Sequence, residues 1–409
     1  MVHISARLLL PIFTVVAYCG CTSINLAQER SPTSFERFLQ DEVWPEAEAR
    51  GITRPIFLAA FANISPDPQV LALTKTQPEY TKPVGRYLGS RVAPEMISSG
   101  RRQVTNWSAA LARIERNFGV EPSILVSIWG LESSYGGVKD NRDVIRSLAT
   151  LAFAGYRVGL FRNELLFALA ILQAGDVPRE RLVGSWAGAM GQPQFLPSSF
   201  VENAVDFSKD GRRDIWTNTP DVLASIANYL HKRGWKHGLP WGYETIIPSN
   251  FDFGRSRSSF RGWATSGFRR ADGGAFPDDT NADADAYLLF PSGAQGPAFL
   301  VTENFVTIKQ YNNSDVYALA VAHLSDRLRG LGPIRGRWPD NDHPLSREQR
   351  IELQRGLAAA GYKVSDFEGH IDFDLRDAIR EVQLAAGMVR DGNPTLGLLE
   401  RVRVGRLRP

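Results

Sequence analysis

The sequence is almost free of cysteine, because both cysteines, Cys19 and Cys21, lie at the very start of a chain of 409 residues. The rest of the chain can therefore form neither an internal disulfide nor a thiolate metal site. A charge excess is missing as well, since 47 basic and 44 acidic residues leave a formal net charge of +3. Such a small imbalance gives no electrostatic footprint for nucleic acid across the whole surface, so nucleic acid is not an expected partner.

Long hydrophobic runs are also missing. No segment after the first twenty residues approaches the roughly 18 uninterrupted apolar residues that a membrane-spanning helix needs. The composition, with 43% hydrophobic and 22% charged residues, is that of an ordinary globular protein. It excludes disordered, collagen-like and coiled-coil chains. At roughly 150 residues per domain, the length predicts two to three domains.

Residues 1–20 are typical of a secretory signal peptide. One basic residue, Arg7, precedes an apolar stretch from Leu8 to Tyr18, which is too short to span a membrane. Cleavage before Cys21 would expose an amino-terminal cysteine of the kind that is acylated in bacterial lipoproteins. The alternative is ordinary cleavage near Ala27. Both place the mature chain in the periplasm, either free or anchored to the outer membrane through a lipid on Cys21.

The remaining chain divides into regions of different pattern. Residues 31–241 show helical periodicity, with runs that end at Gly or Pro. Residues 243–310 hold short β-prone runs among turn residues and predict a small sheet inserted in the helical body. Helical periodicity then returns, residues 336–344 are typical of a linker, and residues 345–405 form a separate module. The predicted fold class is mainly α (α+β).

Residues 121–137 contain the strongest catalytic candidate. The segment predicts a helix that ends at Gly136-Gly137, and Glu132 lies on its apolar face. A carboxyl group in such a place tends either to have a raised pKa, which suits a general acid, or to be hydrogen-bonded. The alternative is a structural ion pair between Glu132 and Arg142 or Arg146.

Several motifs follow one another in a fixed order along the helical region. They are Ile128–Gly136, Ser147–Phe153, Gly184–Ser199, Asp206–Gly211 and Tyr311–Tyr317. In order and spacing they resemble the membrane-bound lytic transglycosylase B family of Gram-negative bacteria. The resemblance extends over residues 31–330 and implies a lysozyme-like catalytic domain, with predicted bounds 31–335.

The resemblance implies an enzyme that cleaves the β-1,4 bond between N-acetylmuramic acid and N-acetylglucosamine in peptidoglycan without net hydrolysis and without a cofactor. Glu132 would protonate the leaving oxygen and then accept the proton of the muramoyl 6-hydroxyl, which closes a 1,6-anhydro ring. The substrate's 2-acetamido carbonyl would replace the second carboxylate of ordinary glycosidases. Two alternatives stay open, a muramidase of the same core and a catalytically inactive peptidoglycan-binding scaffold. The expected partners are peptidoglycan glycan strands, with other cell-wall enzymes as further candidates.

The resemblance also implies a set of substrate-binding residues. They are Ser185, Gln194, Phe195, Tyr311, Asn312, Tyr317 and Arg157. Their amide and hydroxyl groups suit sugar hydroxyls and acetamido groups, and their aromatic rings suit sugar faces. For Phe195 and Tyr311, core packing is an equal alternative. Arg157 matches a basic residue of the family, although the segment before it is shorter than in the family.

Residues 206–217 resemble an EF-hand calcium loop. The candidate ligands are Asp206, Ser208, Asp210, Arg212 and Asp221. The first three occupy loop positions one, three and five, and Arg212 would contribute its backbone carbonyl at position seven. Position twelve is a threonine, but the family takes its last carboxylate from slightly later, where Asp221 lies. A structural Ca²⁺ would brace this loop, and the alternative is an Asx-rich turn without metal.

The carboxy-terminal module resembles a peptidoglycan-binding domain. Its pattern predicts three short helices separated by glycine turns, with Leu375 and Ile379 on the buried face of the second helix. The Asp391-Gly392 turn also matches that fold. Val382 stands where the family usually has phenylalanine. The module is expected to bind the cell wall.

Overall fold

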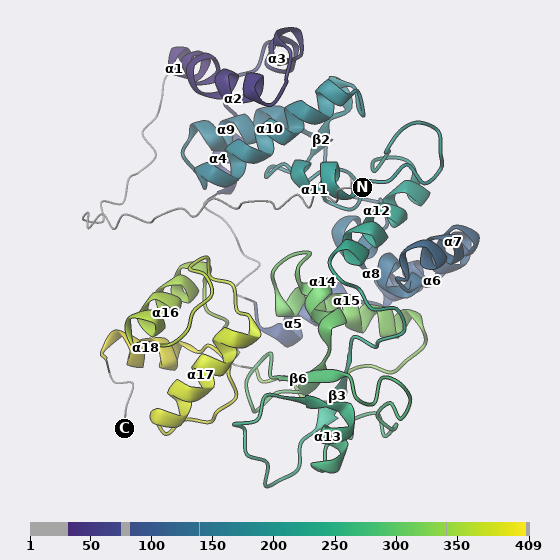
Figure 1. The fold of residues 1–409 in the computed structure, drawn as a ribbon, viewed down its shortest axis with the longest axis vertical. Coiled ribbons are helices and arrows are strands. Elements are labelled where there is room, and N and C mark those ends of the chain that lie inside the picture. The colour runs from purple at the N-terminus through teal and green to yellow at the C-terminus, as the bar shows by residue number, and fades with distance from the viewer. Residues whose placement is uncertain (1–31, 75–81, 139, 341, 406–409) are drawn as a thin grey trace, which may run out of the picture.

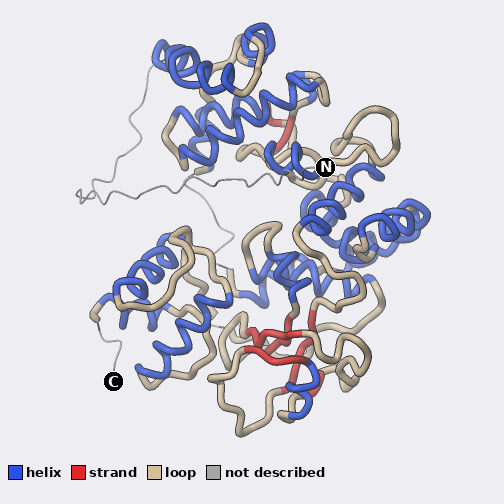
Figure 2. The backbone as a smooth tube through the Cα atoms, in the orientation of Figure 1, coloured by secondary structure: helices blue, strands red, loops and turns tan. Residues whose placement is uncertain are grey.

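The structure is a computed structural model that describes residues 32–74, 82–138, 140–340 and 342–405. The predicted signal peptide, Cys21 and Ala27 lie outside these ranges. Figure 1 and Figure 2 show a mainly helical chain with one small sheet and a carboxy-terminal group of helices beside it, which confirms the predicted fold class. Within the described ranges, no helix combines the length and apolar character that crossing a membrane requires.

The region before the sheet is built almost entirely from helices. These elements are α1 (Pro32–Arg37), η1 (Phe38–Val43), α2 (Trp44–Ala49), α3 (Arg54–Ala60), α4 (Pro68–Leu73), α5 (Val84–Arg91), α6 (Pro94–Asn106), α7 (Ser108–Phe118), α8 (Pro122–Ser133), α9 (Val144–Phe153), α10 (Val158–Ala174), η3 (Arg179–Arg181), α11 (Pro197–Asn203) and α12 (Thr219–Lys232). Two short strands, β1 (Arg142–Asp143) and β2 (Val183–Gly184), pair antiparallel among them.

Helix α8 lies at the centre of this region. It packs against α6, α12 and α15 (Asp315–Leu328), so it is apolar all round rather than along one stripe. Pro122 occupies its first turn, where a missing N–H costs nothing. The helix ends at Ser133 rather than at the predicted Gly136-Gly137, because Ser134 and Tyr135 already adopt left-handed backbone conformations, with φ of 50° and 62°.

The sheet lies between two hydrophobic clusters. Its strands are β3 (Gly242–Ile246), β4 (Arg257–Ser259), β5 (Arg269–Arg270), β6 (Asp285–Leu289) and β7 (Ala298–Val301), in the antiparallel order β4-β6-β7-β3-β5. Side chains alternate along β7. Phe299 and Val301 join the helical core, while Ala298 and Leu300 join a cluster with α13 (Phe260–Thr265). The small sheet predicted from the sequence is therefore present and is covered on both faces.

The carboxy-terminal module has the three predicted helices, α16 (Arg347–Ala359), α17 (Phe373–Ala385) and α18 (Leu396–Arg403). Leu375, Ile379 and Val382 are buried in its own small core. Helix α16 begins with a capping box, in which the Ser346 side chain accepts from Gln349 N and the Gln349 side chain accepts from Ser346 N. In Figure 1 the module lies next to the sheet and to α14 (Glu303–Lys309), with α17 facing them.

Candidate active site

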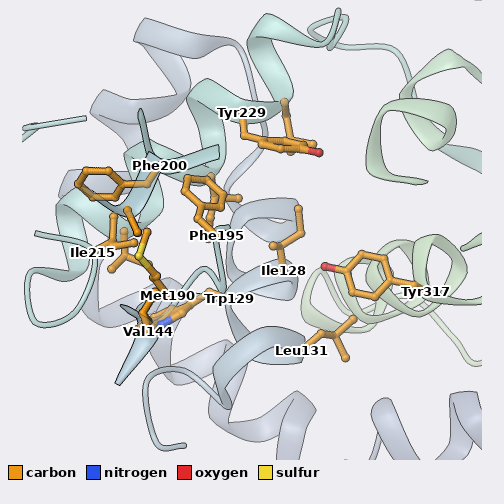
Figure 3. Packing of buried hydrophobic residues seen from close by; sticks show 14 of the residues in the cluster. Ile128, Trp129, Leu131, Val144, Met190, Phe195, Phe200, Ile215, Tyr229 and Tyr317 are labelled. Carbon is orange, nitrogen blue, oxygen red and sulfur yellow. The ribbon is translucent and has the colours of Figure 1, made fainter. Parts of the chain in front are cut away.

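Glu132 lies in the last turn of α8. Its side chain is half-buried, and Tyr317, in the first turn of α15, donates a hydrogen bond to Glu132 Oε1. The two residues meet because α8 packs along α15. Figure 3 shows Tyr317 pointing from α15 toward α8, near Ile128. A phenol hydroxyl therefore fixes the position of the carboxyl group.

Tyr229, Tyr311 and Tyr317, called the tyrosine cluster below, surround this carboxyl group. Their ring centroids are 4.7 Å apart for Tyr229 and Tyr311 and 6.2 Å apart for Tyr311 and Tyr317. Burial, followed by the negative charge of Glu132, raises the pKa of Tyr311 and of Tyr317 well above the usual tyrosine range. The phenols accordingly stay protonated at neutral pH and act as hydrogen-bond donors.

Two hydroxyls of the tyrosine cluster bind backbone carbonyls. Tyr311 Oη donates to Pro193 O at 2.7 Å, and Tyr229 Oη donates to Gln310 O at 2.8 Å. Phe195 packs against both rings, with centroid distances of 5.8 and 6.0 Å. Phe195 is only 2% exposed and packs in the hydrophobic core. A contact of its ring with a sugar stays a prediction. The sequence analysis identified Tyr311 and Tyr317 but missed Tyr229.

The loop between β2 and α11 is held by the side chains of the predicted residues Ser185 and Gln194. Ser185 Oγ accepts from Ala189 N at 3.0 Å, and Gln194 Nε2 donates to Gly191 O at 2.9 Å. Gln194 itself has a left-handed backbone, with φ of 53°. Both side chains are half-buried and shape the loop. A contact of either with substrate stays a prediction.

Gln192 joins this loop to the catalytic helix, and sequence reasoning did not identify it. Its Oε1 accepts from Trp129 Nε1 at 2.7 Å, and its Nε2 donates to Trp216 O at 2.8 Å. Trp129 lies three residues before Glu132, so the amide of Gln192 fixes the face of α8 from which the carboxyl projects. The signal in the sequence was the Gln-Pro-Gln run, in which only the second glutamine was assigned a role.

Gly184 makes the tight fold of this loop possible. A Cβ at this position would lie 2.1 Å from Ala189 O, a backbone atom that moves only with the whole loop. We expect Gly184→Ala to lower the activity on isolated sacculi that the sequence resemblance implies by about 10- to 100-fold, because the loop carrying Ser185 and Gln192 must shift. The matched control is Gly159→Ala in α10, where a Cβ meets no atom within 4 Å. Equal activities of the two variants would contradict the role given to the loop.

Asn312 and Arg157 lie differently from the residues described so far. Asn312 is exposed in the turn before α15 and lines, with Tyr317, a cavity of about 840 Å³. Arg157 is exposed in the turn between α9 and α10, outside the tyrosine cluster. The structure thus places Asn312 in one cavity with Tyr317 and leaves Arg157 without a described contact to the tyrosine cluster. A contact of Asn312 with substrate stays a prediction.

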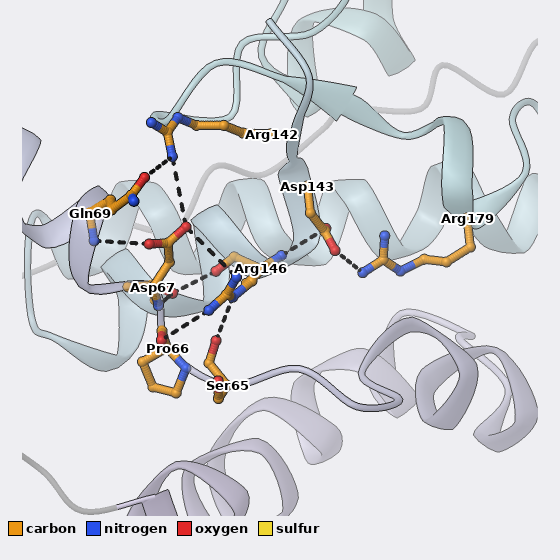
Figure 4. Close-up of polar contacts among 9 residues, drawn as sticks. Ser65, Pro66, Asp67, Gln69, Arg142, Asp143, Arg146 and Arg179 are labelled. Atoms are coloured by element: carbon orange, nitrogen blue, oxygen red, sulfur yellow. Dashed lines mark hydrogen bonds and ion pairs between the residues drawn. The ribbon is translucent and has the colours of Figure 1, made fainter.

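The alternative of a structural ion pair for Glu132 involved Arg142 and Arg146, and Figure 4 shows where these arginines lie. Both are bound to Asp67, with N···O distances of 3.8 and 3.9 Å. Arg146 Nε also donates to Ser65 O at 2.7 Å. Arg142 of β1 and Arg146 of α9 thus tie these two elements to the loop before α4. The described partner of Glu132 is instead Tyr317.

Another glutamate of the helical region, Glu164 of α10, is buried and has a structural task. Ser198 donates to it twice, from its N to Glu164 Oε2 at 2.9 Å and from its Oγ to Glu164 Oε1 at 2.7 Å. Burial raises the pKa of Glu164, and these hydrogen bonds oppose the rise. Because both oxygens are occupied at the start of α11, Glu164 is an anchor for that helix.

The candidate calcium loop brings three carboxylates together. Oxygens of Asp206, Asp210 and Asp221 all lie within 4.8 Å of one another. Asp221 is fully buried, and burial raises its pKa although three backbone N–H groups oppose the rise. Ser208 Oγ is 3.5 Å from Asp206 Oδ1. Three clustered carboxylates offer the hard oxygen ligands that suit a hard cation such as Ca²⁺. The backbone carbonyl of Arg212 as a further ligand stays a prediction.

Comparison with known proteins agrees with this geometry. A model of the family "Transglycosylase SLT domain" matches residues 34–326. The chain belongs to this family. A second model, "Putative peptidoglycan binding domain", matches residues 346–401. The resemblance predicted from the sequence is thereby confirmed. Enzymes of the family need no cofactor for their chemistry.

Individual relatives of this transglycosylase support the same assignment. Membrane-bound lytic murein transglycosylase B of Escherichia coli (strain K12) is 33% identical over 253 residues, which are 59% of this chain and 66% of that protein, just under two thirds. SltB3 of Pseudomonas aeruginosa, solved in complex with NAG-anhNAM-pentapeptide, is 45% identical with a TM-score of 0.80, over 90% of this chain and 99% of SltB3. The E. coli lytic transglycosylase SLT35, solved in complex with calcium, is 28% identical with a TM-score of 0.59, over 72% of this chain and 92% of SLT35.

Proposed function

We propose that this transglycosylase cleaves the β-1,4 bond between N-acetylmuramic acid and N-acetylglucosamine in peptidoglycan and leaves 1,6-anhydro ends, in cell-wall remodelling and turnover. The observation that carries the proposal is the half-buried Glu132 at the end of α8, held by the Tyr317 hydroxyl within the tyrosine cluster. A scaffold that only binds the wall has no use for a carboxyl group held in this way.

Glu132 acts first as an acid and then as a base. Its proton passes to the glycosidic oxygen as the C–O bond breaks, and the resulting carboxylate takes the proton of the muramoyl 6-hydroxyl as that oxygen bonds to the anomeric carbon. The hydrogen bond from Tyr317 stabilises the carboxylate between the two steps and keeps it oriented toward both oxygens. The proton balance closes without water.

An internal nucleophile explains why one carboxylate suffices. A hydrolase of this type uses a second carboxylate to bind or activate the incoming group. Glu164, the buried glutamate of α10, has both oxygens bound by Ser198. The 6-hydroxyl of the same sugar reaches the anomeric carbon at a high effective concentration, so no activated water is required. SltB3 was also solved with NAG-NAM-pentapeptide, the corresponding saccharide without the anhydro ring.

Calcium would be held by the carboxylates of Asp206, Asp210 and Asp221. It would supply positive charge that ties residues 206–211 to the start of α12. The ion would take no part in the proton transfers. Trp216, at the end of the same loop, is linked to the catalytic helix through Gln192, which bonds Trp216 O and Trp129 Nε1.

The cellular place of action is proposed from the sequence. The amino-terminal segment has the pattern of an export signal, and the E. coli relative is named as membrane-bound. We expect the chain in the periplasm, on glycan strands, with Cys21 as the site of a lipid anchor in the outer membrane. Metabolic labelling with a clickable fatty acid would distinguish Cys21 acylation from cleavage near Ala27.

Mass spectrometry of digested sacculi tests the proposed function. A lytic transglycosylase releases muropeptides that end in 1,6-anhydro-N-acetylmuramic acid, which are lighter by one water than the reducing products of a muramidase. We expect anhydro products to predominate. Reducing ends would identify the muramidase, and binding to sacculi without any released product would identify the inactive scaffold.

A further inference from the structure

The carboxy-terminal module is joined to the first turn of α15 by a buried ion-pair network. Arg376 of α17 lies 2.6 Å from Asp315, and Lys309 at the end of α14 lies 2.8 Å from the same carboxylate. The side chains of Arg376 and Asp315 are only 5% and 8% exposed. Burial alone would raise the pKa of Asp315, but Lys309 and Arg376 together hold it below its usual value. The carboxylate is therefore charged, and it holds both cations.

This network lies two residues from the phenol that binds the catalytic acid. Ser314 is the N-cap of α15 and accepts from Tyr317 N, Asp315 is the first helical residue, and Tyr317 is the third. All three belong to one turn, so a displacement of Asp315 moves the ring of Tyr317. The same cavity of about 840 Å³ is lined by Tyr317 and by Arg376.

Other contacts keep the module rigid against the catalytic region. Arg376 Nη1 donates to Gly392 O at 3.0 Å, so its guanidinium is held from its own module as well as by Asp315. Arg380 Nη2 donates to Leu288 O of β6 at 3.0 Å. The rings of Tyr287 and Phe373 stack at a centroid distance of 4.4 Å. A module tethered only by a flexible linker would make none of these contacts.

We infer that Arg376, a residue of the peptidoglycan-binding module, is a positioning residue of the catalytic site, because through Asp315 it fixes the turn of α15 from which Tyr317 holds Glu132. The inference rests on the proposed function and extends it. The module then has a task in catalysis itself, besides adsorption to the wall. Its removal or displacement should slow the chemical step even for a substrate too short to reach a separate binding domain.

The test compares Arg376→Met with Arg390→Met in the full-length chain. Arg390 also pairs across the same interface, at 3.3 Å from Asp252 in the sheet region, but does not touch α15. The substrate is a soluble tetrasaccharide prepared from peptidoglycan, and kcat, KM and the pH profile of kcat are measured. We expect Arg376→Met to lower kcat by about 10- to 100-fold with little change in KM, and Arg390→Met to match the parent. The alkaline limb of the kcat profile should move to higher pH, because a weakened hydrogen bond no longer favours the ionised acid.

Two further variants separate positioning from folding. Arg376→Lys keeps the charge beside Asp315 but cannot hold both Asp315 and the Gly392 carbonyl, so an intermediate kcat and a smaller pH shift are expected even if the methionine variant does not fold. Tyr317→Phe should lower kcat, and adding Arg376→Met to it should lower kcat no further, because both changes break the same link. Parent-like kcat and pH profile in the folded arginine variants, or multiplicative losses in the double variant, would overturn the inference. Products with reducing ends from the parent protein would instead refute the proposed function. The two tests are distinguishable, because the ratio of variant to parent kcat is measured in the same way whichever product forms.

Discussion

Replacement of Glu132 by glutamine is expected to abolish release of anhydro-muropeptides from sacculi. The amide is nearly the same size as the carboxyl group but can neither donate an acidic proton to the leaving oxygen nor accept one from the 6-hydroxyl. Both steps fail together. We therefore expect a loss of rate at the upper end of the roughly 10²- to 10⁴-fold that general acid–base catalysis contributes. Chromatography of soluble products measures this loss. Co-sedimentation with sacculi should remain at the parent level, because the carboxy-terminal module is unchanged.

Glu121 provides the matched control on the same helix. It precedes the first turn of α8, and its Oε1 accepts from Gly238 N at 3.3 Å. At 1.5 Å per residue, the two glutamates are roughly 16 Å apart along the helix. Glu121→Gln should therefore keep turnover near that of the parent. Near-parent turnover in Glu132→Gln, or an equal loss in both variants, would contradict the assignment of Glu132 as the acid.

The sequence predicted the secondary structure well where local signals decide it. Pro122 marks the start of α8 correctly, because proline favours a first helical turn whatever surrounds it. The end of α8 was placed too late, at Gly136-Gly137. The helix stops at Ser133 because the Tyr135 hydroxyl donates to Met96 O on α6 and its ring packs against Gly130. That contact joins residues 39 positions apart, so no local pattern reveals it.

The candidate site was predictable in its chemistry and less so in its supports. Glu132, Tyr317 and Asn312 come from motifs. The structure brings Glu132 and Tyr317 into contact, and Asn312 shares a cavity with Tyr317. The link from Trp129 to Gln192 spans 63 positions, and the link from Arg376 to Asp315 joins two modules. Long-range hydrogen bonds of this kind depend on how helices pack, which the spacing of residues along one chain does not encode. Tyr229, labelled in Figure 3, illustrates the same limit, because it lies on α12 at a position that none of the recognised motifs includes.

The calcium-loop carboxylates were predicted partly from local spacing and partly from the family pattern. Asp206 and Asp210 follow from loop spacing, whereas Asp221 was suggested by the family pattern. The structure places the three within 4.8 Å. Asp221 has a second task that spacing does not show. Its Oδ1 accepts from Phe207 N and Ser208 N at 2.9 Å, and its Oδ2 accepts from Asp214 N at 3.1 Å.

Calcium should stabilise the parent protein, and the variant Asp210→Asn should lose this effect. Asp210 is exposed and supplies one of the clustered carboxylates, so its replacement removes a ligand at little cost to the ion-free fold. The stabilisation should be smaller at acid pH than at neutral pH. Burial raises the pKa of Asp221, so protons compete with the ion earlier than for an ordinary aspartate. Thermal unfolding with calcium and with a chelator at two pH values measures this. An equal calcium effect in the parent and in Asp210→Asn would contradict the predicted ligand set.

Replacement of Asp221 by alanine is expected to lower the free energy of unfolding by about 3–5 kcal/mol even without calcium, because three backbone donors lose a charged acceptor in a buried site. Chemical denaturation in the presence of a chelator measures the loss, and Asp210→Asn is the control that should change little. The sign of the pH dependence follows from the raised pKa of Asp221. In ion-free parent protein the folded state binds the Asp221 proton more tightly than the unfolded chain, so the titration of Asp221 contributes stability that is fully present below the unfolded pKa and is lost as pH rises through the folded pKa. The hydrogen bonds from the three backbone donors persist above that pKa. The alanine variant should lack the pH-dependent part of the unfolding free energy that comes from Asp221. An unfolding free energy equal to that of the parent at every pH would show that Asp221 neither caps the loop nor titrates within it.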